Sequence, residues 1–173
     1  MYISENLHAR MKNLEIERKF LVDRKKWSLL AKPPGTEYLQ GYLSIDEEKV
    51  VRVRVAGDKG FLTIKGKSET FSHPEFEYEI PVDDATELIT QYTVSRVEKT
   101  RTRIPAGKHV WEVDEFHGEN EGLLMAEIEL ESPDDQFNMP EWLGKEVTSD
   151  HRYHNSFLSI NPYRTWQEKA PNH

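Results

Sequence analysis

Residues 15–22 have the sequence Glu15-Ile16-Glu17-Arg18-Lys19-Phe20-Leu21-Val22, in which every second residue from Glu15 to Lys19 is charged. Successive side chains of an extended strand point to opposite faces, so Glu15, Glu17 and Lys19 share one face. Two carboxylates on one face repel each other unless something neutralises them, and a divalent cation with oxygen ligands would do so. The stretch therefore predicts a strand with one charged, metal-binding face.

The same pattern recurs along the chain, with one sign of charge on most strands. The basic positions are Arg52, Arg54, Lys65, Lys67, Lys99, Arg101 and Arg103. The acidic positions are Glu75, Glu77, Glu79, Glu112, Asp114, Glu127, Glu129 and Glu131. Like charges on one face of a sheet are mildly destabilising, so a pattern repeated this often indicates that acidic strands face basic ones.

The arrangement of elements predicts a mainly β (α+β) fold. Apolar alternation marks eight extended segments, at 14–23, 37–45, 49–56, 60–67, 75–81, 94–104, 109–116 and 123–131. Short turns join most of them, so the sheet should be antiparallel. Helices are expected at 24–31, 83–91 and 150–159. We expect an eight-stranded closed barrel, or tunnel, with a few flanking helices and a C-terminal helix, its charged face inward.

Such an interior would hold a ligand that is both anionic and accompanied by metal. About eight strands enclose room for side chains or one small ligand. Arginine and lysine bind phosphoryl oxygens, and carboxylates bind the cations that accompany them. A polyphosphate with a divalent metal ion satisfies both.

Composition narrows the class of protein. The chain has 173 residues, a formal net charge of −8 and no cysteine. The negative charge argues against a nucleic acid partner, and the lack of cysteine excludes disulfide and thiol chemistry. No apolar run is long enough to span a membrane or form a signal peptide, so we expect a cytoplasmic protein with no membrane partner. Residues 1–13 form an extension, 14–160 the domain, and 161–173 a polar tail expected to pack poorly. A homodimer is left as an alternative to a monomer.

No tryptophan or histidine is assigned to the site. The tryptophans, which we expect to pack outside the barrel, are Trp27, Trp111, Trp142 and Trp166. His151 and His154 lie three apart on the expected last helix, and without a third ligand they are treated as surface residues. Near strand ends or turns, where no site is expected, lie His73, His109 and His117.

Glu15-x-Glu17-x-Lys19 resembles the ExExK signature of the CYTH superfamily, also called triphosphate tunnel metalloenzymes. Later matches follow in the family's order: Arg52-x-Arg54, Lys65, Glu77-x-Glu79, Lys99-x-Arg101, Glu112-x-Asp114 and Glu127-x-Glu129. Residues 144–148, with Asp150-x-Arg152-Tyr153, resemble the closing segment of the short bacterial members. The resemblance covers about 14–158. The thirteen residues before the first strand depart from it, because many short members start almost at once.

The resemblance implies an antiparallel tunnel that binds a linear triphosphate with Mg²⁺ or Mn²⁺, two ions to a site. The metal ligands that it implies are Glu15, Glu17, Asp114, Glu127 and Glu129. The triphosphate ligands that it implies are Lys19, Arg52, Arg54, Lys65, Lys99, Arg101 and, from the last helix, Arg152. The catalytic set is Glu17, Lys19, Lys99 and Glu129, supported by Glu77, Glu79 and Glu112.

The activity favoured by the sequence is metal-dependent hydrolysis of inorganic tripolyphosphate to pyrophosphate and phosphate. Nucleoside triphosphate is an alternative ligand. Three alternatives stay open: a class IV-type adenylyl cyclase, a thiamine triphosphatase, and a non-catalytic module that binds polyphosphate or nucleotide. No residue is assigned to protonate the leaving group.

Overall fold

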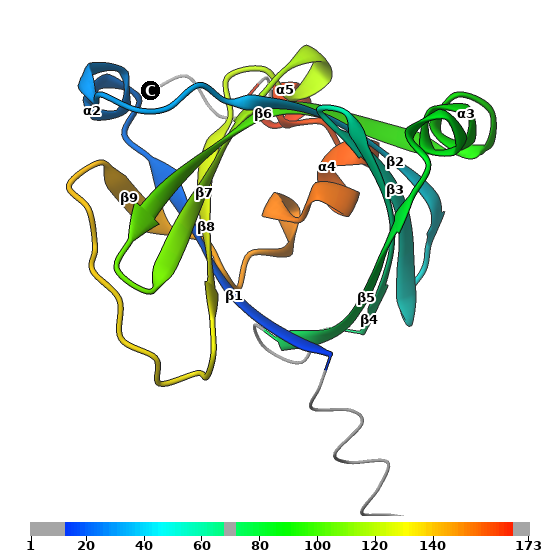
Figure 1. Cartoon of the computed structure of the whole chain (residues 1–173). Coiled ribbons are helices and arrows are strands. Elements are labelled where there is room, and N and C mark those ends of the chain that lie inside the picture. Colours follow the sequence, from blue (N-terminus) through cyan, green and yellow to red (C-terminus); the bar gives the residue numbers. More distant parts are fainter. Residues whose placement is uncertain (1–12, 68–71, 168–173) are drawn as a thin grey trace, which may run out of the picture.

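Eight strands close into an antiparallel barrel, and a short ninth strand pairs with the first (Figure 1). The strands are β1 (Leu14–Val22), β2 (Thr36–Ile45), β3 (Lys49–Ala56), β4 (Lys59–Gly66), β5 (Ser72–Ile80), β6 (Ser95–Ala106), β7 (His109–Phe116), β8 (Leu124–Leu130) and β9 (Leu143–Glu146). The computed structural model describes residues 13–67 and 72–167. The expected barrel is confirmed. Of the extension at 1–13, only Asn13 is among the described residues. The end of the tail, from residue 168, also lies outside them.

Strand β1 closes the barrel because it pairs on both of its edges. One edge pairs with β8 along residues 16–21. The other edge pairs with β5 at its start, where Glu15 lies opposite His73, and with β9 at its end, where Phe20 lies opposite Glu146. The sheet order runs from β5 to β1 and then β9, and the additional β1–β5 pairing closes the eight barrel strands into a ring. Strand β9 was not predicted, because four residues carry too little alternation to mark a strand.

Short helices cover the outside and one end of the barrel. Helix α2 (Arg24–Leu29) begins at Asp23, whose side chain accepts a hydrogen bond from the Lys26 backbone, and α3 (Val82–Tyr92) lies across the barrel wall. A 3₁₀ turn, η1 (Gly118–Asn120), follows β7. Of the described helices, none is long and apolar enough to cross a membrane.

The single helix expected at 150–159 is wrong. The chain forms a 3₁₀ turn, η2 (His151–Tyr153), then leaves the helical conformation at His154 (φ −69°, ψ 136°), then forms α4 (Asn155–Ile160). Asp150 caps η2 by accepting a hydrogen bond from the Arg152 backbone, so this cap serves only one short turn. The break lets the chain turn over the end of the barrel, where α4 lies across the opening when the barrel is seen end-on (Figure 1).

The largest apolar cluster lies on the outer face of the barrel, as predicted for most of the tryptophans. Trp27 of α2, Trp111 of β7 and Trp142 of the segment before β9 pack together with Phe20. The ring centroids of Trp111 and Trp142 are 5.8 Å apart at a steep angle, and those of Phe20 and Trp111 are 5.6 Å apart. A second outer cluster, under α3, contains Val53, Ala85 and Ile89. The apolar faces of the strands are therefore covered from outside.

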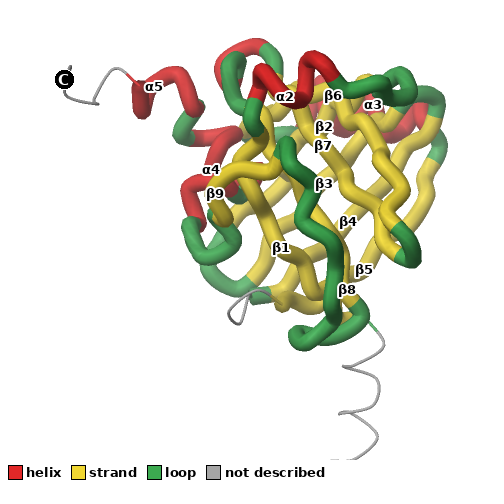
Figure 2. The backbone as a smooth tube through the Cα atoms, turned by 90° about the vertical axis from the view of Figure 1, so that its left-hand side faces the viewer, coloured by secondary structure: helices red, strands yellow, loops and turns green. Residues whose placement is uncertain are grey.

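A third cluster fills one end of the barrel interior. Leu158 of α4 is fully buried there among Tyr42, Val97, Phe116 and Met125, together with Leu123 and Val147. Figure 2 shows α4 and a following helix, α5 (Tyr163–Gln167), at this end of the barrel. The tail from residue 161 was expected to pack poorly. That expectation is wrong for its described part, because Tyr163 and Trp166 pack against the cluster. Helix α4 thus closes one end of an otherwise charged interior.

We predict that Trp111→Ala destabilises the fold strongly. Its side chain is completely buried at the centre of the outer cluster. Removing a large buried aromatic side chain costs about 3–5 kcal/mol of unfolding free energy. Urea unfolding followed by circular dichroism would measure the loss. Tyr92→Ala, on the exposed end of α3, is the control and should change stability by less than about 0.5 kcal/mol. Equal effects of the two variants would contradict the central place of Trp111 in the largest apolar cluster.

Candidate functional site

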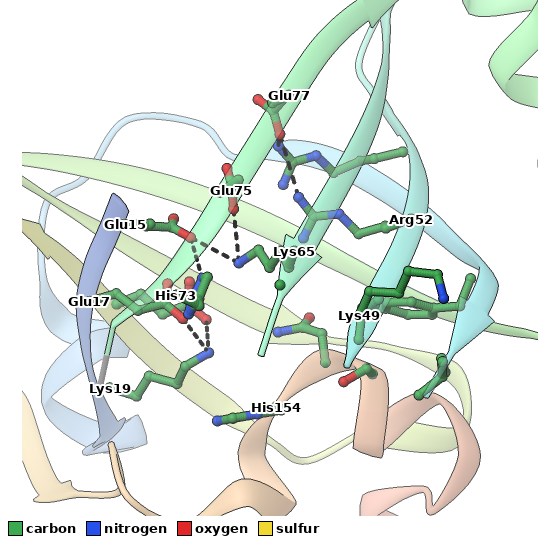
Figure 3. Close-up of a pocket in the computed structure, with 18 of the residues that line it drawn as sticks. Glu15, Glu17, Lys19, Lys49, Arg52, Lys65, His73, Glu75, Glu77 and His154 are labelled. Atoms are coloured by element: carbon green, nitrogen blue, oxygen red, sulfur yellow. Dashed lines mark hydrogen bonds and ion pairs between the residues drawn. The ribbon is translucent and has the colours of Figure 1, made fainter. Parts of the chain in front are cut away.

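The barrel interior contains a cavity of about 400 Å³ to which all eight barrel strands and α4 contribute side chains (Figure 3). Nine carboxylates and nine lysine or arginine side chains are among its lining residues. Acidic groups gather on the wall of β1, β5 and β8, and basic groups gather on β3, β4 and β6. The predicted inward charged face is therefore present, and its two signs lie on opposite walls.

The acidic wall is built around the β1–β8 pairing. In its register Glu17 lies directly opposite Glu129, and Lys19 lies opposite Glu127. The Lys19 ammonium is 3.1 Å from Glu17 and 3.2 Å from Glu127. Burial opposes the charge of Lys19, but these carboxylates raise its pKa above the ordinary value. Burial and the charge of Glu15 raise the pKa of Glu129. Lys19 therefore neutralises part of a crowded acidic wall.

His73 joins this wall from β5. Its Nε2 lies 2.6 Å from Oε2 of Glu15, which also lies 3.0 Å from Nζ of Lys65. Burial alone would raise the pKa of Glu15, but the hydrogen bond from His73 and the charge of Lys65 hold that pKa well below its usual range. Lys65 also lies 3.1 Å from Glu75, and Figure 3 shows it between the two carboxylates.

The donor set on this wall fits a divalent metal ion. Ligand atoms of Glu15, Glu17 and His73 all lie within 4.8 Å of one another. Carboxylate oxygens with one imidazole nitrogen form a donor set that divalent cations accept. Two of the predicted metal ligands are therefore brought together, with Glu129 opposite Glu17 in the adjoining strand. The metal ion implied by the resemblance fits the residues that are present.

The basic wall holds two guanidinium groups whose Nε atoms lack hydrogen-bond partners in the described part of the chain. Arg52 and Arg54 reach the same carboxylate oxygen of Glu77, at 3.5 and 3.3 Å. Their Nε atoms are buried and have no hydrogen-bond partner among the described residues. Burial and the charge of Arg52 lower the pKa of Arg54 to about 10. Buried, unsatisfied donors are costly, so these two side chains are suited to an anionic ligand that supplies the missing acceptors.

Asp114 supports the other basic groups from behind. It accepts hydrogen bonds from Nε and Nη2 of Arg101, both at 2.7 Å, and from Nζ of Lys99 at 2.8 Å. Burial lowers the pKa of Lys99 to about 8, against the opposing charge of Asp114. Lys99 also donates to Asn155 of α4 at 3.0 Å. Glu112 lies nearer the solvent and binds Arg101 and Arg103, both at 2.9 Å.

The structure separates the predicted site residues into two groups. Those that line the cavity are Glu15, Glu17, Lys19, Arg52, Arg54, Lys65, Glu77, Lys99, Arg101, Glu112, Glu127 and Glu129. Three others are not among the described lining residues. Asp114 is fully buried beneath the wall, Glu79 is exposed farther along β5, and Arg152 is exposed and paired with Asp150 at 2.6 Å.

Sequence reasoning missed several lining residues. His73, set aside as a residue near a strand end or turn, and His154, expected at the surface, both line the cavity. His73 lies two residues before Glu75 and so shares its face, a signal that was available from the alternation. Burial, with the charge of Lys19, lowers the pKa of His154 to about 4. Tyr42 and Asn155 also line the cavity, and no local sequence pattern marks them.

Asp114→Asn should destabilise the protein by about 3–5 kcal/mol, because it leaves Arg101 and Lys99 buried without their shared counter-charge. The matched control is Glu112→Gln, in which Arg101 keeps Asp114. That side chain is part-exposed, so its ion pairs contribute at most about 1 kcal/mol. Denaturant unfolding of both variants checks the difference. A loss at Asp114 no larger than that at Glu112 would show that the buried cluster does not depend on this carboxylate.

Comparison with known proteins places the chain in a family. The CYTH domain family matches residues 13–157. The inorganic triphosphatase of Acetivibrio thermocellus is 49% identical over 156 residues, covering 89% of this chain and 98% of its own length. That of Nitrosomonas europaea is 36% identical over 152 residues, covering 85% and 97%. The crystal structure of an inorganic triphosphatase superposes with a TM-score of 0.59 at 33% identity, covering 84% of this chain and 94% of the other. From the match over most of its length, the chain belongs to the CYTH domain family.

Proposed function

We propose that this protein is a metal-dependent inorganic triphosphatase that hydrolyses tripolyphosphate to pyrophosphate and phosphate inside the barrel. The observation that carries the proposal is the division of the cavity into a wall of cationic side chains with unsatisfied guanidinium donors and a wall of carboxylates. Two relatives that resemble the chain over nearly their whole length are named inorganic triphosphatases, which supports the same activity.

The basic wall binds the phosphoryl oxygens. Its residues in this role are Arg52, Arg54, Lys65, Lys99, Arg101 and, from the acidic wall, Lys19. Lysine and arginine fixed before the substrate arrives stabilise the charge that develops on the leaving pyrophosphate without having to reorganise. Asp114, Glu77 and Glu112 hold these cations in place through the ion pairs described above. Arg152 and Glu79 would have to act at the ends of the tunnel.

The acidic wall would hold Mg²⁺ or Mn²⁺, with two ions to a site. Glu15, Glu17, Glu127 and Glu129 are the carboxylates that face the cavity there. Because the lining carboxylates and cations balance in number, the side chains alone offer no excess positive charge to a polyanion. A divalent ion held by these carboxylates would supply that charge and would lower the pKa of a water that attacks phosphorus. Phosphoryl transfer needs such positioning and charge stabilisation more than a covalent nucleophile.

A substrate panel tests the activity. Phosphate release from tripolyphosphate, ATP, pyrophosphate and thiamine triphosphate should be measured with Mg²⁺ and with Mn²⁺. We expect tripolyphosphate to be hydrolysed fastest, with equal amounts of pyrophosphate and phosphate, because the described cavity wall is charged at most positions and offers a nucleobase little to stack on. Cyclic AMP formed from ATP at a rate equal to phosphate release from tripolyphosphate would identify a cyclase instead. Binding without turnover of any substrate would identify a non-catalytic module.

Glu17→Gln should abolish hydrolysis while the fold is kept. The substitution removes a carboxylate from the acidic wall and relieves repulsion with Glu129, and Lys19 keeps its ion pair with Glu127. Steady-state kinetics and thermal unfolding should be measured on the same preparations. Glu98→Gln, an exposed glutamate of β6 beside Lys99 in sequence, is the control and should keep full activity. Retained activity in Glu17→Gln would place the metal ligands elsewhere.

A further inference from the structure

We propose that Glu15, Glu17 and His73 form a metal subsite that prefers a divalent transition-metal ion to Mg²⁺, with the imidazole of His73 as a ligand. The subsite lies within the cavity described above, and its use in catalysis rests on the proposed triphosphatase activity. Metal binding at the subsite does not require that activity, so the two can be tested separately.

The backbone holds the three side chains together. His73 of β5 lies directly opposite Glu15 of β1, in the pairing that closes the barrel. Side chains opposite one another in an antiparallel pair have Cβ atoms about 4.5–5.5 Å apart. Glu17 follows Glu15 on the same inward face, and all three ligand atoms fall within 4.8 Å of one another. His73 is only 9% exposed, so its ring is confined to the cavity wall. Strand register, and not a chance side-chain conformation, therefore brings the imidazole to the carboxylates.

The nitrogen donor changes which ion the site prefers. Mg²⁺ takes oxygen ligands and retains several waters, so an imidazole adds little to its affinity. The affinity of nitrogen-containing sites for divalent ions rises from Mn²⁺ through Co²⁺ to Cu²⁺. A site with two carboxylates and one imidazole therefore discriminates against Mg²⁺ more strongly than a site of carboxylates alone.

Lys65 now occupies part of the space that a metal ion would take. Its Nζ lies 3.0 Å from the Glu15 oxygen that also bonds His73. Lys65 also lies 3.1 Å from Glu75, so it retains a carboxylate partner when Glu15 binds a metal ion. The second carboxylate of the subsite, Glu17, is paired with Lys19, which likewise keeps Glu127. Each lysine thus has a reserve partner, and the two glutamates can be released to a metal ion together.

Metal titration without substrate tests the proposal. Chelator-treated wild type, His73→Gln and His154→Gln should be titrated with Co²⁺ and with Mg²⁺ by calorimetry. Glutamine can still donate a hydrogen bond to Glu15 but lacks the imidazole nitrogen. In His73→Gln we expect Co²⁺ affinity to fall by at least about tenfold and Mg²⁺ affinity to stay unchanged. His154→Gln, the matched control for a histidine in the same cavity, should bind both ions as the wild type does.

A spectroscopic measurement on the wild type makes the test independent of any variant. Pulsed electron paramagnetic resonance of bound Mn²⁺ should show coupling to an imidazole ¹⁴N, and this coupling should vanish in His73→Gln. Equal losses of Co²⁺ and Mg²⁺ affinity would overturn the proposal and make His73 a residue that only orients Glu15. Unchanged Co²⁺ affinity, or wild-type Mn²⁺ without nitrogen coupling, would also overturn it. Failure of tripolyphosphate hydrolysis with selective Co²⁺ binding intact would refute the proposed function alone.

Discussion

Opposite charges that pair on the inner face of the barrel, mostly between neighbouring strands, are the constraint on which the rest of the structure depends. A buried charge without a partner costs several kcal/mol, so a barrel with this many inward charges is stable only if each has a counter-charge within reach. Asp114 is shared by Lys99 and Arg101, Lys19 by Glu17 and Glu127, and Lys65 by Glu15 and Glu75. Each group has more than one partner, so an arriving ion or anion can take one partner away without leaving the other charge isolated.

Because the interior is committed to charge, the apolar cores lie elsewhere. The tryptophan cluster around Trp111 and the smaller cluster under α3 cover the outer face, and Leu158 of α4 fills one end. The hydrophobic contribution to stability therefore comes mainly from surfaces that no ligand touches. This separation explains how a cavity with buried, unsatisfied groups at Arg52 and Arg54 can be maintained. Apolar packing on the outer side of the same strands offsets the free-energy cost of these unsatisfied groups.

Closure of the barrel also determines the composition of the acidic wall. The β1–β5 pairing brings together Glu15 and His73, which are 58 residues apart in the chain. The β1–β8 pairing adds Glu129 opposite Glu17. At the other end of the cavity, the break at His154 turns α4 inward, so that Asn155 reaches Lys99. The metal-binding groups thus depend on the two pairings of β1, and the phosphate-binding Lys99 depends in part on the position of α4.

The sequence by itself determined the strands, the barrel and the inward charged face, because alternation with a period of two is a local property of an extended chain. It also determined most of the lining residues, from Glu15 to Glu129. The tertiary structure alone decided how deep each inward residue lies. Glu112 and Asp114 share a face, yet Glu112 lies near the solvent and Asp114 is fully buried beside Lys99. Glu77 lines the cavity, but Glu79, on the same face, does not. Only the structure brought His73 to Glu15 and divided the last predicted helix at His154. Depth and neighbours depend on strand stagger and ring closure, which are long-range pairings that no local period encodes.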